Sequence, residues 1–81
     1  MFIDEMFEEF LVTKHIPISE AIRKVFQDKL ADPKDYTPTT IKQVENGYQL
    51  FRKKHPEFPE YVVRRYVKLA SPKLAGLLNW Q

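Results

Sequence analysis

Apolar residues recur along this chain every three or four positions, the spacing of the buried face of an amphipathic helix. The first stripe starts at Ile3, opposite acidic residues that are favourable near a helix N-terminus, and should end near His15. The second follows Ser19, a residue type that caps helix N-termini, and stops before a turn at residues 32–36. The stripes are Ile3, Met6, Phe7, Phe10 and Leu11, then Ile18, Ala21, Ile22, Val25, Phe26 and Leu30. The pattern predicts one helix for each stripe.

Prolines indicate where further helices begin. Asp32-Pro33, Thr37-Pro38 and Ser71-Pro72 each place an N-cap residue type before a residue suited to the first helical position. The residue before a proline is also kept out of the helical conformation, as an N-cap requires. We therefore expect helices to start at these dipeptides, and a short connector between His55-Pro56 and Phe58-Pro59.

A third helix is predicted from Thr37 to Lys54. A basic last turn at residues 52–54 suits the negative end of the helix dipole. The apolar stripe of this segment is Ile41, Val44, Tyr48 and Phe51. The sequence leaves two alternatives open, one continuous helix or two pieces broken at Asn46-Gly47.

Two shorter helices complete the pattern, the fourth from about Pro59 to Ala70 and the fifth from Pro72 to about Leu78. The inward residues of the fourth are predicted to be Val62, Tyr66, Leu69 and Ala70, and its outward residues Arg64, Arg65 and Lys68. The fifth should bury Leu74, Leu77 and Leu78 and hold Trp80 against the body.

These elements predict an all-α fold, a small orthogonal bundle of four to five helices in a single domain over residues 1–81. Hydrophobic residues make up 43% of the chain and aromatic residues 14%, enough apolar surface for a core of this size. The predicted core is Phe7, Phe10, Ile22, Val25, Phe26, Ile41, Val44, Phe51, Val62, Tyr66, Leu69 and Leu74.

The amino-acid composition indicates the cellular compartment in which the protein is expected. The absence of cysteine excludes a disulfide framework, thiolate chemistry and a cysteine-type zinc site, and it favours a reducing compartment, by default the cytoplasm. No apolar run approaches the roughly 18 residues that a membrane span needs. Residues 1–10 are acidic where a signal peptide would be basic. We expect neither export by this route nor a membrane partner.

Charge is unevenly distributed, although the net charge is only +2. Residues 1–51 hold six basic and nine acidic residues, whereas residues 52–81 hold seven basic and two acidic residues. The later basic set is Arg52, Lys53, Lys54, Arg64, Arg65, Lys68 and Lys73. It is suited to contact a phosphate backbone. The alternative is a solvated face that the acidic first helix balances, within one molecule or between copies.

The segment Thr39-Thr40-Ile41-Lys42-Gln43-Val44-Glu45-Asn46-Gly47 resembles the recognition-helix end of the lambda-repressor-like helix-turn-helix family, where a short polar helix typically closes on a Glu-Asn-Gly turn. In that family the recognition helix lies in the major groove and its N-terminal side chains reach base edges. The resemblance implies that Thr39, Thr40, Lys42 and Gln43 contact DNA, with Gln43 able to pair with adenine. The alternative is an amphipathic helix that Thr37 and Pro38 cap and that continues through Gly47, because Tyr48 and Phe51 extend its stripe.

Catalytic and metal chemistry are not expected. The only serines, Ser19 and Ser71, are suited to capping, and the two glycines provide no phosphate-binding loop. His55 lies near Glu57 and Glu60, but the prolines between them make a stiff connector without the regular ligand spacing of a helical metal site. We expect no enzyme, cofactor, metal or small-molecule substrate.

Two hypotheses for function follow. The first is binding of double-stranded DNA in a regulatory or accessory role, through the helix from Thr37 and the basic C-terminal face. Its predicted contacts are Thr39, Thr40, Lys42, Gln43, Arg52, Lys53, Lys54, Arg64, Arg65 and Lys68. The second is a protein-interaction module, either an adaptor or inhibitor that docks on a larger assembly, with Tyr61 or Trp80 as an anchor, or a homo-oligomer.

Overall fold

Helices account for most of the computed structural model, which describes residues 2–29 and 36–80. The elements are α1 (Ile3–Phe7), η1 (Glu8–Thr13), α2 (Ile18–Lys29), α3 (Pro38–Lys54), α4 (Val62–Ala70) and α5 (Pro72–Leu77). No β-strand occurs in these described ranges, and the predicted all-α class is confirmed. The predicted helix start at Asp32-Pro33 and the side chain of Leu30 lie outside the described residues.

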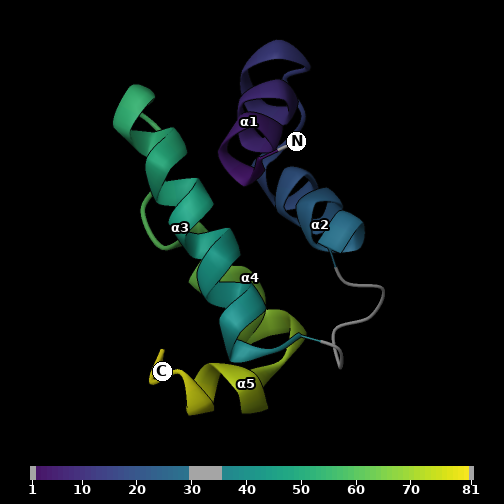
Figure 1. Ribbon diagram of the computed structural model, residues 1–81, viewed down its shortest axis with the longest axis vertical. Helices are drawn as coiled ribbons and strands as arrows, with labels where there is room; N and C mark the ends of the chain where they lie inside the picture. Colours follow the sequence, from purple (N-terminus) through teal and green to yellow (C-terminus); the bar gives the residue numbers. More distant parts are fainter. Residues whose placement is uncertain (1, 30–35, 81) are drawn as a thin grey trace.

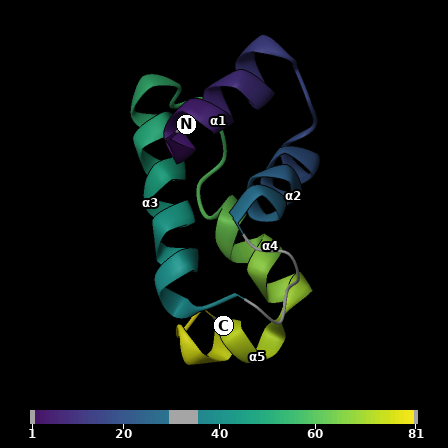
Figure 2. The ribbon, with the colours of Figure 1, turned by 45° about the vertical axis from the view of Figure 1, so that its right-hand side comes forward.

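The longest helix, α3, organises the bundle. Figures 1 and 2 show α3 running nearly the full height of the molecule, with α1 crossing its C-terminal half and α5 lying across its N-terminal end. The radius of gyration is 11.8 Å, against about 11.7 Å expected for a compact chain of this length. Among the helices that the structure describes, none is both long and apolar enough to cross a membrane.

α3 is one continuous helix, so the alternative of a break at Asn46-Gly47 is wrong. Thr37 caps its start as predicted, because its hydroxyl oxygen accepts a hydrogen bond from the Thr40 N–H at 3.1 Å. Gly47 is buried where α1 packs on α3, and a Cβ atom there would lie 2.6 Å from the Cβ of Ile3. The glycine permits this close helix contact and does not end the helix.

The first predicted helix changes its winding halfway. η1 is a π-helix, in which the Lys14 N–H donates to the Glu9 carbonyl at 2.9 Å. His15 follows with φ of 55°, and the Ile16 N–H donates to the Phe10 carbonyl at 2.9 Å, which satisfies the helix end as C-terminal caps do. The wider turn shifts later residues around the axis, and Phe10 is half-buried at the core edge instead of fully buried as predicted.

α2 begins one residue before the predicted cap. Its first residue is Ile18, so Ser19 lies inside the helix and is not its N-cap. The Pro17 carbonyl accepts a hydrogen bond from the Ala21 N–H at 2.9 Å, because the fixed φ of proline is compatible with a helix start at this point.

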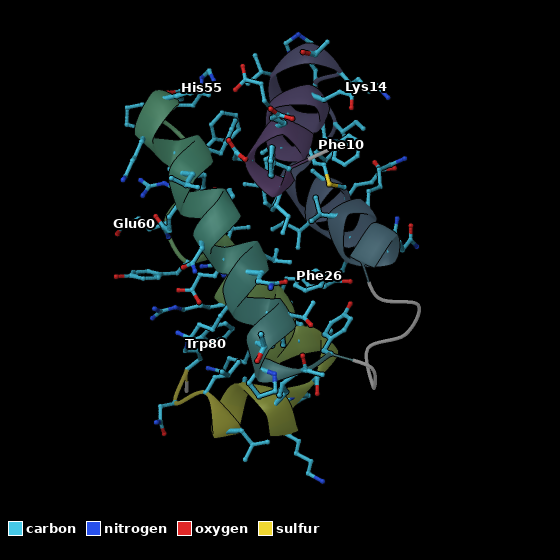
Figure 3. All side chains as sticks on the ribbon, in the orientation of Figure 1. Phe10, Lys14, Phe26, His55, Glu60 and Trp80 are labelled. Carbon is cyan, nitrogen blue, oxygen red and sulfur yellow. The ribbon has the colours of Figure 1, made fainter. Side chains whose placement is uncertain are left out.

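The core joins side chains from α1 to α5. Eight of the predicted core residues are buried: Phe7, Ile22, Val25, Phe26, Ile41, Val44, Phe51 and Leu74. Phe26, which Figure 3 labels, stacks on Tyr36 and Tyr66, with ring centroids 4.6 and 5.3 Å apart. Tyr48 is fully buried and meets Phe7 edge-on, with centroids 5.1 Å apart. Aromatic rings therefore join α1 to α3 and α2 to α4.

Residues 55–61 form the connector between α3 and α4, and α4 starts at Val62 instead of near Pro59. Tyr61 has φ of 60° and ψ of 19°, a left-handed conformation that does not fit inside a right-handed α-helix. The helix therefore begins only after this residue.

The buried face of α4 differs from the predicted one. Val63 and Val67 are buried, whereas Val62 is half-buried and Leu69 is 79% exposed. The predicted and observed faces are one residue out of phase, which is about 100° around the helix axis. The shift turns Arg64 towards α3, where it pairs with a buried acid.

α5 closes the end of the bundle near the start of α3. It begins at Ser71-Pro72 as predicted, buries Leu74, and is followed by Trp80, which is 9% exposed. The prediction that Leu77 is buried is wrong, because it is 69% exposed, and Leu78 is half-buried.

Candidate nucleic-acid interface

A hollow beside α4 gathers several of the predicted basic residues. Its lining, called here the cationic hollow, consists of Glu60, Tyr61, Arg64, Arg65, Lys68 and Trp80. Glu60 and Trp80 lie on the same side of α3 (Figure 3). Arg65 and Lys68 are exposed, and Tyr61 is 53% exposed. Cations and aromatic rings therefore share one surface.

Arg64 is fixed at the base of the cationic hollow. Its Nε and Nη2 atoms donate to Oε1 of Glu45 at 3.0 and 2.9 Å. Its guanidinium lies 4.6 Å from the ring centroid of Tyr61 and 5.3 Å from that of Trp80, within cation–π range. The Lys42 ammonium lies 5.4 Å from the Trp80 centroid and 3.9 Å from Oε2 of Glu45. α3, α4 and the C-terminal segment thus meet at this cluster.

Glu45 is buried because it lies on the face of α3 that packs against the core. It lies four residues after Ile41 and three before Tyr48, both of which face the core, and it is 8% exposed. A buried carboxylate needs charged partners. Among the described residues, no group donates a hydrogen bond to its Oε2, which leaves Arg64 as its main partner.

Arg52 serves the fold, although it was predicted as a surface contact. Its Nε donates to the Phe58 carbonyl at 2.7 Å, and its Nη1 lies 3.4 Å from Oε1 of Glu60. The Tyr48 hydroxyl donates to the Pro59 carbonyl at 2.6 Å. Burial raises the pKa of Tyr48 to about 12, and the positive charge of Arg52 acts in the opposite direction. α3 therefore holds the connector through two of its side chains.

The predicted DNA contacts on α3 separate into different places. Lys42 joins the cluster at Trp80, whereas Gln43 lines another hollow with Phe2 and Asp4. Thr39 is exposed in the first turn of the helix, and Thr40 is hydrogen-bonded in the cap. The helix does not stop at the Glu-Asn-Gly turn that the helix-turn-helix resemblance implies.

Lys53 and Lys54 are exposed at the opposite end of α3. A helix rises 1.5 Å per residue, so Lys53 lies about 16 Å along the axis from Lys42. The structure thus gathers Lys42, Arg64, Arg65 and Lys68, and it leaves the last turn of α3 apart. Lys73 is exposed on α5.

His55 connects the end of α3 to η1. Its Nε2 shares a hydrogen bond with Oε2 of Glu8 at 2.6 Å, and its Nδ1 lies 3.6 Å from Oε1 of Glu57. Its ring packs 4.9 Å from that of Phe51. In the part of the chain that the structure describes, no group of acidic and histidine side chains is arranged to hold a metal ion.

The sequence did not indicate that Glu45 pairs with Arg64 beside the cationic hollow or that Arg52 and Arg64 are held by contacts within the fold. The position of Glu45 within the apolar stripe of α3 was the available signal. Tyr61 was expected only as an anchor for a protein partner, and Trp80 either as such an anchor or packed against the body. Their proximity to the cations depends on the left-handed backbone at Tyr61 and on α5.

Comparisons with protein-family models, with curated proteins and with solved structures gave no match.

Proposed function

We propose that this protein is a non-enzymatic, nucleic-acid-binding module with a regulatory or accessory role on DNA. The observation that carries the proposal is the cationic hollow, in which exposed Arg65 and Lys68 lie beside Tyr61 and Trp80. Lysine and arginine supply the phosphate contacts that dominate affinity for nucleic acid. A cysteine-free chain that binds DNA in this way suits a reducing compartment such as the cytoplasm.

The electrostatics of the hollow support an anionic ligand. Its two nearby acids are already engaged, Glu45 with Arg64 and Glu60 with Arg52. Arg65 and Lys68 therefore retain their positive charge for an incoming group. Because Arg64 is committed to Glu45, its role in binding is to shape the surface and not to contact phosphate.

The first half of α3 extends this surface. Lys42 lies against Trp80, and Thr39 is exposed nearby in the helix, so both are positioned to contact a backbone that follows the hollow. Gln43 is assigned no part in this mode, because it lines a different hollow beside the acidic side chain of Asp4. Phosphate contact, and not base readout by a recognition helix, is the mode that we propose.

The experiment is a titration against a random DNA duplex at about 50 and 200 mM salt. The double variant Arg65→Gln with Lys68→Gln should weaken binding at least tenfold at the lower salt. It should also reduce the slope of log affinity against log salt by about 2, since two phosphate contacts are removed.

The matched control is Lys53→Gln with Lys54→Gln, which removes the same charge from the far end of α3. We expect less than a threefold loss of affinity. An equal loss in both double variants would show that net charge, and not the hollow, governs binding, and no binding of duplex or single-stranded DNA by the unmodified protein would refute the proposal. Circular dichroism confirms that each variant remains folded.

A second candidate is self-association, favoured by an apolar hollow between α2 and α4. Its lining includes Ile18, Ile22, Val62, Tyr66 and the 79% exposed Leu69. A contiguous exposed apolar surface of this kind is typical of a protein contact. Light scattering during chromatography tests it: a concentration-dependent dimer that Leu69→Ser abolishes would support it, and a monomeric mass at all concentrations would exclude it.

A further inference from the structure

Tyr61 holds its ring in the cationic hollow by means of an unfavourable backbone conformation. A bulky residue at φ of 60° is rare, and such conformations persist only where the surroundings impose them. The carbonyls of Phe58 and Pro59, just before it, are held by Arg52 and Tyr48, and its own carbonyl accepts from the Arg65 N–H at 3.0 Å. The backbone that carries this ring is therefore fixed before any ligand arrives.

The ring is supported and still accessible. The Arg64 guanidinium lies 4.6 Å from its centroid, and that guanidinium is itself anchored on Glu45. Even so, Tyr61 remains 53% exposed. An exposed aromatic ring with a fixed cation behind it is a stacking surface for another flat π system.

Cations lie beside this stacking surface at the spacing of neighbouring side chains on one helix. Arg65 and Lys68 are three residues apart on α4, so they share a face, and both line the hollow with Tyr61. An unpaired nucleotide offers the two complementary groups, a base with an open face and a phosphate. A base inside a duplex is stacked on both sides and cannot use the ring.

We propose that the cationic hollow binds unpaired nucleotides, with a base stacked on Tyr61 and phosphates against Arg65 and Lys68. The inference rests on the proposed function and specifies its ligand: DNA that carries single-stranded stretches binds more tightly than duplex DNA. Stacking of one base on an aromatic side chain corresponds to roughly a 5- to 160-fold change in affinity.

The experiment compares three labelled 20-mers of about equal charge per strand by fluorescence anisotropy: oligothymidylate, the same strand without bases, and a random duplex. Oligothymidylate should bind most tightly. The duplex should bind more weakly, and the abasic strand at least fivefold more weakly, than oligothymidylate. Equal binding of the abasic strand and oligothymidylate would overturn the inference, because phosphates alone would then explain the affinity.

Variants at Tyr61 separate stacking from folding. Tyr61→Gly removes the ring and also relieves the left-handed backbone, which glycine adopts readily. It should lower affinity for oligothymidylate at least fivefold, by a larger factor than for the duplex, and keep the melting temperature within a few degrees. Tyr61→Phe, which keeps a stacking ring, should bind oligothymidylate within twofold of the unmodified protein.

Different results would refute nucleic-acid binding and base stacking on Tyr61. If Tyr61→Gly binds oligothymidylate normally while Arg65→Gln with Lys68→Gln weakens all three ligands, nucleic-acid binding stands and stacking on Tyr61 is refuted. If the unmodified protein binds none of the three strands, both are refuted.

Discussion

Gly47 shows how one small residue sets the distance between two helices. A Cβ atom at this position would lie 2.6 Å from the Cβ of Ile3, and the Asp4 backbone nitrogen would be 3.4 Å away. Neither atom is the far end of a flexible side chain, so α1 itself would have to move. The sequence left open whether the helix breaks at Asn46-Gly47; the helix is continuous there, and Gly47 permits close packing.

We expect Gly47→Ala to destabilise the protein. Alanine favours a helix by about 1 kcal/mol over glycine, but overpacking of a tight contact costs about 1–3 kcal/mol. The contact should outweigh the propensity by up to about 2 kcal/mol, measured by urea unfolding. Asn46→Ala, at the exposed neighbouring position, gains propensity without a clash and should be neutral or slightly stabilising. A more stable Gly47→Ala protein would contradict the packing argument.

Tyr48 should make the protein sensitive to alkaline pH. Because burial raises the pKa of Tyr48 to about 12, the folded state keeps this proton between about pH 10 and 12, where an unfolded tyrosine loses it. The stabilisation is therefore complete below pH 10 and is lost as the pH rises towards 12, by an amount of order 2 kcal/mol.

The matching variant is Tyr48→Phe, which should be less stable at pH 7 by about 1 kcal/mol, since the Pro59 carbonyl loses its donor at 2.6 Å. The difference between the two proteins should shrink as pH rises above 10 and reverse in sign before pH 12, because only the tyrosine loses this stabilisation. Chemical denaturation at each pH measures it. A constant difference across that range would show that Tyr48 does not titrate differently in the folded state.

At the scale of elements, the connector at residues 55–61 depends on side chains of α3. Arg52→Gln removes the 2.7 Å hydrogen bond to the Phe58 carbonyl and the contact with Glu60. We expect a loss of about 1–3 kcal/mol in the free energy of unfolding, because a partly buried carbonyl is left without a partner. Lys53→Gln, one position along and exposed, should change it by less than about 0.5 kcal/mol. Equal effects would remove the structural role assigned to Arg52.

The positions of the helices could largely be predicted from sequence, but the rotation of each helix about its own axis could be predicted only in part. Thr37-Pro38 gave the start of α3, and its apolar stripe gave the buried face, because propensity, capping and periodicity agree there. In α4, valine, tyrosine and leucine occupy adjacent faces, so periodicity alone did not fix the phase. The Arg64–Glu45 pair, which joins residues 19 apart in sequence, decides it.

The sequence predicted that basic residues form the candidate site, but not how they are arranged. Basic residues after position 51 indicated an anionic partner, but which of them are exposed depends on tertiary pairing. Arg52 and Arg64 are held by the fold, while Arg65 and Lys68 are available. The left-handed backbone at Tyr61 has no local sequence signal such as glycine or asparagine.

At the scale of the whole molecule, Trp80 joins the end of the chain to the long helix. It is 9% exposed and lies near Lys42 of α3 and Arg64 of α4. Trp80→Ala should cost about 3–5 kcal/mol, as for other large buried aromatics. In a domain of this size the melting temperature should fall by at least about 12 °C, measured by calorimetry.

The control for this variant is Leu77→Ala, at the end of α5 just before Trp80 but 69% exposed, which should shift the melting temperature by no more than about 4 °C. If Trp80→Ala lowers the melting temperature no more than Leu77→Ala does, the C-terminal segment contributes little to the stability of the bundle. If Trp80→Ala alone is destabilised, closure by this segment is a condition for folding of the whole chain.

The position of Trp80 has one practical consequence. It is the only indole in the protein, and two cations approach it within the surface proposed to meet DNA. Its intrinsic emission should therefore report, without any label, both the unfolding of the chain and the arrival of a negatively charged strand at its surface.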